Sequence, residues 1–183
     1  GQAESDGEIF YEIGKNNISG EIKLFMDLGL IEHYYPQESL KRTALKEFIK
    51  LACGGDFLYD KYFPDSNSEI QTLSFNEALI AMLDMTGYAY FAKRNGGNEM
   101  DYYSTALNYG ILDGVNLAEA KKRLTAEQFF KMAYNTLNVS LVSYDNSYYK
   151  INENNTILSS NLKLTKVMGI VKANSYTALN GLG

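Results

Sequence analysis

The stretch LTAEQFFKMAYNTL (residues 124–137) decides the fold of this 183-residue chain. Thr125 and Gln128 have the spacing of a capping box, in which each side chain accepts a hydrogen bond from the other residue's backbone amide. The residues that would face a core recur at helical spacing: Phe129, Met132, Ala133, Thr136 and Leu137. The stretch therefore predicts an amphipathic helix that begins after Thr125 and packs against other elements.

Two stretches upstream follow the same design. Ser74 and Glu77 form a second capping-box pair at the start of a helix predicted over about 75–86. Its predicted core face consists of Ala78, Ala81, Met82 and Met85. A helix predicted over about 40–52 has an apolar stripe of its own, and Gly54 follows it as a C-cap.

Two further helices are expected, one capped by Ser19 and one capped by Asn98. The stripe expected for the second is Tyr103, Ala106 and Leu107. Residues 25–52 and 106–137 then align as one repeated unit of helix, Gly with two apolar residues, loop and helix, and 73–85 resembles half of a third unit. Such repeats bury their apolar stripes only against one another. The predicted fold is therefore mainly α, a bundle of helix-loop-helix repeats.

The pattern changes after Val139 to short apolar runs divided by Asn-rich turns, which are typical of strands. Strands are expected within 141–151, 156–158 and 162–171, and another within 9–13. The expected organisation is an N-terminal segment 1–18 with a possible strand, helical repeats over 19–139 (19–55, a truncated 56–97, and 98–139), and a β-rich extension 140–183 that leads toward a domain outside this chain.

Composition argues against several classes of function. The 17 basic and 22 acidic side chains give a net charge of −5, the wrong sign for binding a phosphate backbone. His33 and Cys53 are the sole residues of their types, so neither a multi-histidine metal site nor an internal disulfide is expected. No apolar run approaches the roughly 18–20 residues of a membrane span. We expect no cofactor, no nucleic-acid partner and no membrane span in this chain; the oligomeric state stays open.

Several stretches of the chain resemble a known family. They are Gly96–Gly97 followed by Tyr102–Tyr103, then 106–114 and 124–139. On these residues the part from 19 to 139 resembles the S-layer homology (SLH) domain family of bacterial cell-surface proteins, and the tail 167–177 resembles the strand that follows such domains. The resemblance implies an extracellular, wall-associated protein with three pseudo-symmetric repeats. It also implies a partner, the anionic secondary cell-wall polysaccharide bound in grooves between the repeats.

The family's Thr-Arg-Ala-Glu motif is divided in this chain. In the motif, Thr and Glu form a capping box, while Arg can meet an anionic polymer. The first unit keeps the arginine, Arg42, after Lys41, and the other two units keep the box. The resemblance therefore assigns polysaccharide binding to Arg42 and Lys41, with Lys122 and Arg123 as substitute charges. With one of three arginines kept, binding should be weak and should depend on Arg42.

Other interpretations stay open. Arg42 could instead be solvated or ion-paired with Glu38 or Glu47. A catalytic pair of His33 and Cys53 would need an orienting group and an oxyanion site, and the sequence signals neither. A glycan hydrolase needs two positioned carboxylates. The candidates for these are Asp84, Asp101, Asp113 and Glu119, but any acidic chain offers such pairs.

The favoured interpretation is a non-catalytic module that anchors or presents a bacterial protein at the cell wall. One alternative is a structural spacer or protein-interaction domain that has lost polymer binding. A wall-glycan hydrolase is a less favoured alternative.

Overall fold

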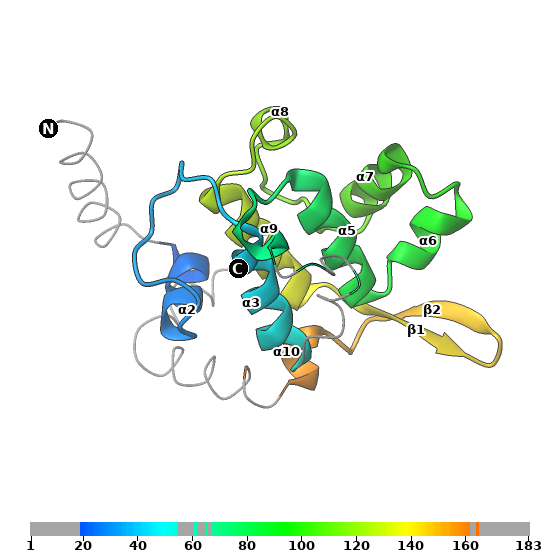
Figure 1. Ribbon diagram of the computed structural model, residues 1–183. Coiled ribbons are helices and arrows are strands. Elements are labelled where there is room, and N and C mark those ends of the chain that lie inside the picture. Colours follow the sequence, from blue (N-terminus) through cyan, green and yellow to red (C-terminus); the bar gives the residue numbers. More distant parts are fainter. Residues whose placement is uncertain (1–18, 55–60, 62–64, 66, 162–163, 165–183) are drawn as a thin grey trace, which may run out of the picture.

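Residues 19–54, 61, 65, 67–161 and 164 are described by the computed structural model. The chain is mainly helical, as predicted, and carries a two-stranded sheet. In chain order the elements are α2 (Gly20–Asp27), α3 (Arg42–Cys53), η1 (Ser68–Ile70), α5 (Phe75–Thr86), α6 (Ala89–Arg94), α7 (Glu99–Asn108), α8 (Leu117–Ala120), α9 (Ala126–Asn138), β1 (Leu141–Asp145), β2 (Tyr148–Asn152) and α10 (Ile157–Ser160). Figure 1 shows the helices gathered into one body, with the β1–β2 hairpin extending below α6.

The capping boxes predicted at Thr125 and Ser74 are both present. The Thr125 amide donates to Gln128 Oε1 at 2.8 Å, and the Gln128 amide donates to Thr125 Oγ1 at 3.3 Å. Ser74 and Glu77 make the same exchange at 2.9 and 3.1 Å. Lys41, the residue before α3, makes no side-chain cap bond. The first unit therefore lacks the box, as the sequence indicates.

The α5 helix is buried over more of its surface than the predicted stripe. Ala78, Ala81 and Met82 are buried as predicted, but Met85 is only half-buried. Further buried residues are Phe75, Leu79, Leu83 and Thr86. The reason is that α5 packs against α3, α6, α7 and α9.

The α7 helix buries a different stripe from the one expected. Its buried residues are Tyr102, Thr105 and Ala106, whereas Tyr103 is half-buried and Leu107 is 42% exposed. The reason is that α7 packs against both α5 and α6. Its buried face is therefore shifted by one residue from the predicted stripe. Ala106 belongs to both stripes, so periodicity alone could not separate them.

Four phenylalanines from three helices form the centre of the core. Between ring centroids, Phe25 of α2 lies 6.1 Å from Phe48 of α3 and 5.2 Å from Phe130 of α9. Phe129 of α9 lies 6.2 Å from Phe48 and 5.1 Å from Phe130. All four are at most 2% exposed. Aromatic packing therefore joins α2 and α3 to α9.

The starts of α3, α5 and α9 meet at one end of the helical body. The segment 38–41 before α3 pairs with 71–73, which precedes α5, and with 125–126, where α9 begins. The isolated β-bridges join Ser39 with Thr125 and Lys41 with Thr72. Backbone amides reinforce them: Leu73 donates to the Leu40 carbonyl and Ala126 to the Glu38 carbonyl, each at 2.8 Å. We call these three segments the junction.

The secondary structure after α9 agrees only in part with the prediction. Residues 141–152 form the expected strands, an antiparallel hairpin. The strand predicted over 156–158 is wrong, because Thr156 caps α10 and exchanges amide hydrogen bonds with Ser159, both at 2.9 Å. The candidate strand 9–13 and, apart from residue 164, the run 162–171 lie outside the described residues.

Candidate functional site

The four predicted binding residues lie around the junction. Lys41 precedes α3 and Arg42 is its first residue, whereas Lys122 and Arg123 follow α8. Arg123 Nη1 donates to Ser39 Oγ at 2.7 Å, which places the turn after α8 beside segment 38–41. The side chains of Lys41, Lys122 and Arg123 are exposed. This end of the molecule therefore presents cations from two distant parts of the sequence.

Arg42 has a structural role that the sequence did not predict. It is ion-paired with Glu77 of α5, whereas the carboxylates expected from the sequence were Glu38 and Glu47. Glu77 also accepts a hydrogen bond from the Ser74 amide at 2.9 Å. The two paired side chains are only 22% and 23% exposed. One carboxylate thus caps α5 and binds Arg42, so the guanidinium holds α3 against α5.

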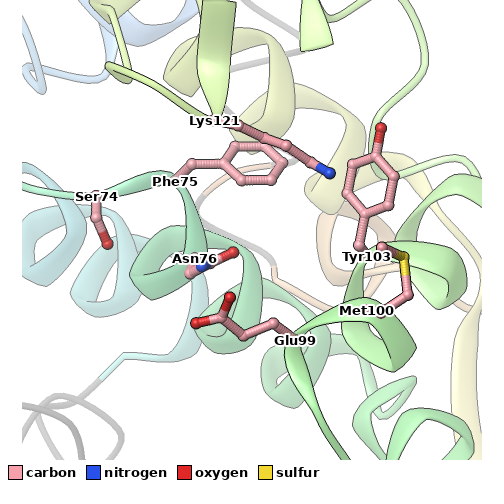
Figure 2. A pocket seen from close by; sticks show the side chains of 7 residues that line it. All are labelled: Ser74, Phe75, Asn76, Glu99, Met100, Tyr103 and Lys121. Atoms are coloured by element: carbon pink, nitrogen blue, oxygen red, sulfur yellow. The ribbon is translucent and has the colours of Figure 1, made fainter. Parts of the chain in front are cut away.

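A pocket of about 250 Å³ lies next to the junction, between the first turns of α5 and α7 and the end of α8 (Figure 2). It is lined by Ser74, Phe75, Asn76, Glu99, Met100, Tyr103 and Lys121. Phe75 is 3% exposed and Met100 is 59% exposed. The wall of the pocket therefore extends from the core to the solvent.

Lys121 and Tyr103 form the most specific contact in this pocket. The Lys121 Nζ lies 3.7 Å from the centroid of the Tyr103 ring, a cation–π distance. Phe75 meets the same ring edge-on at 6.2 Å. Figure 2 shows the amine of Lys121 pointing from α8 toward Tyr103 on α7. The buried Phe75 therefore supports the Tyr103 ring, and the cation–π contact holds the positive charge of Lys121 at the mouth of the pocket.

The pocket combines groups that suit a sugar with an anionic substituent. When Lys121 turns to pair with a negative charge, the face of the Tyr103 ring that it covers can pack against the apolar face of a pyranose. Asn76 adds an amide that can donate and accept hydrogen bonds. Among the lining residues Glu99 is the one carboxylate, whereas glycoside hydrolysis uses two. The arrangement is therefore suited to binding.

Two of the four candidate catalytic acids, Asp84 and Asp101, have other contacts. Asp84 is ion-paired with Lys61 at 3.2 Å and lies 4.0 Å from Lys93. Asp101 accepts a hydrogen bond from the Asn98 amide at 3.0 Å and so completes a capping box for α7. These contacts give both carboxylates a structural role.

Cys53 lines a second pocket, of about 530 Å³, with residues of α10 and β1. Burial raises the pKa of its thiol, which is the opposite of what activates a nucleophilic cysteine. His33 is not among the residues that line this pocket. The environment of Cys53 therefore favours a packing role.

Sequence reasoning missed the residues that build the pocket. Tyr103 is predicted in the core stripe of its helix, and the sequence prediction names Lys122 as a binding residue in place of Lys121. One signal was available: Met100 and Tyr103 are spaced three apart on a helix, so they share a face. That face became recognisable as a site only once Tyr102 and Ala106 were seen to fill the core.

Within the described ranges, no three His, Cys, Asp or Glu side chains are grouped so that they could hold a metal ion. The helices in that part of the chain are also too short or too polar to span a bilayer. Comparison with protein-family models, curated proteins and solved structures finds no match for the chain.

Proposed function

We propose that this chain is a non-catalytic, extracellular module of the SLH type, which anchors a bacterial protein at the cell wall by weak binding to anionic wall polysaccharide. The observation that carries the proposal is the pocket beside the junction, where Tyr103 and Lys121 offer an aromatic surface and a cation to one ligand. In this proposal α3, α5 and α9 are the second helices of three pseudo-symmetric repeats. Their shared start at the junction supports that equivalence.

The charges around the junction favour weak binding. Lys41, Lys121, Lys122 and Arg123 are exposed there, but the acidic residues Glu38 and Glu127 are exposed at the same end. Solvent-exposed charge pairs contribute about 0.2–1 kcal/mol each, and salt screens them. Firm attachment therefore requires several contacts along one polymer, and binding should fall as salt rises.

Co-sedimentation with purified wall sacculi tests the proposal. We expect the chain to sediment with sacculi that carry their polysaccharide and not with sacculi from which it has been removed chemically. Tyr103→Ala and Lys121→Ala should reduce binding several-fold, whereas Lys93→Ala, which removes an exposed lysine of α6, should not. Binding that is unaffected by both pocket variants would contradict the assignment of this pocket.

One observation favours a second candidate, a structural spacer or protein-interaction domain. Arg42 and Arg123 are both used within the fold, in contacts with Glu77 and Ser39. If the wild-type chain fails to sediment with intact sacculi even at low salt, the spacer is the better description. Arg42→Ala then affects stability alone.

A further inference from the structure

The β1–β2 hairpin has one aromatic face and one polar face. Its register pairs Tyr144 with Tyr149 and Val142 with Ile151, so these four side chains share a face. The opposite face carries Tyr148 and the ion pair of Lys150 with Asp145, at 3.1 Å. Figure 1 shows that the hairpin extends beyond the helices that it contacts.

The aromatic face is held in place by the helical body. Gly87 leaves room for β1, because a Cβ there would lie 2.7 Å from the Val142 carbonyl oxygen. The Tyr149 ring stacks on Tyr90 of α6 with 3.7 Å between centroids and 19° between planes. Tyr144 then packs on Tyr149 at 5.1 Å and 60°. The rings are therefore ordered before any ligand arrives, which lowers the entropy cost of binding.

These ordered rings remain accessible to solvent. Tyr144 is 63% exposed, Tyr149 is 42% exposed and Ile151 is 37% exposed. A protein interface of ordinary size uses about 20–30 residues on each side, far more than this face offers. By itself the face is far smaller than such an interface, and its extent matches one or two sugar rings.

We propose that this face binds a linear chain of β-1,4-linked glucopyranose units. All ring substituents of such a unit are equatorial, so both faces of the ring consist of axial C–H groups. The C–H groups carry small positive charges and pack favourably on the negative face of an aromatic ring. One sugar stacks on Tyr144, and the next contacts Ile151 and the exposed edge of Tyr149, whose ring face is covered by Tyr90. The face has no charged residue of its own, which fits an uncharged glycan and distinguishes it from the pocket at Tyr103.

Isothermal titration with cellohexaose tests the proposal. We expect a dissociation constant on the order of 1 mM for the wild type. Tyr144→Ala should weaken binding roughly tenfold, while Tyr144→Phe should keep it because the ring is retained. The matched control is Tyr148→Ala, which removes a tyrosine that is 54% exposed from the other face of the same hairpin. A fructan hexamer, built of furanose rings, should not bind.

Several results would overturn the proposal. The first is that the titration releases no heat of binding with cellohexaose at several millimolar. The second is that Tyr144→Ala and Tyr148→Ala weaken cellohexaose binding equally. The third is that the wild type self-associates and Tyr144→Ala abolishes this self-association. Tyr103→Ala should leave cellohexaose binding intact. This arm separates the hairpin face from the wall-anchoring pocket, since either site can fail without the other.

Discussion

Phe129 has no exposed surface and packs against Phe48 and Phe130 in the centre of the core. Phe129→Ala should therefore lower the free energy of unfolding by about 3–5 kcal/mol, the cost of lost transfer energy and of the cavity left behind. Leu107→Ala, on the exposed side of α7, serves as the control and should cost little. Chemical denaturation measures both. A loss below about 1 kcal/mol for Phe129→Ala would place the residue outside the core.

Buried and half-buried tyrosines should make the protein sensitive to alkali. Burial raises the pKa of Tyr34, Tyr88, Tyr102 and Tyr134 above the ordinary value of 10.0. With rising pH the unfolded chain loses these protons first, so the folded state binds more protons. Their contribution to stability is then fully present below about pH 10 and is lost as pH rises through the folded-state pKa values.

Urea denaturation between about pH 9 and pH 11 checks this expectation, since linkage predicts a falling free energy of unfolding over that range. The Tyr88 hydroxyl also donates to the Ser140 carbonyl at 2.6 Å, a bond that the phenolate cannot make. Tyr88→Phe should lower stability near neutral pH and flatten the decline in alkali. An unchanged free energy of unfolding up to pH 11 would contradict the argument.

At the scale of elements, Gly87 determines how closely the hairpin approaches α5. It ends the helix with φ at +88°, and a Cβ would meet the Val142 carbonyl oxygen at 2.7 Å. Gly87→Ala should therefore cost more than the roughly 1–2 kcal/mol of left-handed backbone strain alone. Gly54→Ala is the matched control, because φ is +74° there and the space around it is open. Equal losses of stability for the two variants would mean that the hairpin moves aside without cost.

At the scale of the whole molecule, α9 depends on residues from the N-terminal part of the chain. The first turn of α9 donates backbone hydrogen bonds to Glu38 and Pro36, and its phenylalanines pack on Phe25 and Phe48. A fragment of residues 98–161 lacks all four partners. We expect the fragment to show little helical circular dichroism, whereas the intact chain should unfold in one cooperative transition. A fragment that unfolds cooperatively on its own would contradict the shared core.

The sequence by itself determined where α2, α5, α7 and α9 begin and that α9 is amphipathic. Capping boxes and stripes involve residues three or four apart, so the chain specifies them locally, as Thr125 with Gln128 illustrates. Only the tertiary structure decided the face that α7 buries, the ion pair of Arg42 with Glu77, and the contact of Lys121 with Tyr103. These features join residues that are distant in sequence or depend on packing against two neighbours. No local spacing encodes such a choice, because it depends on how the other helices are placed.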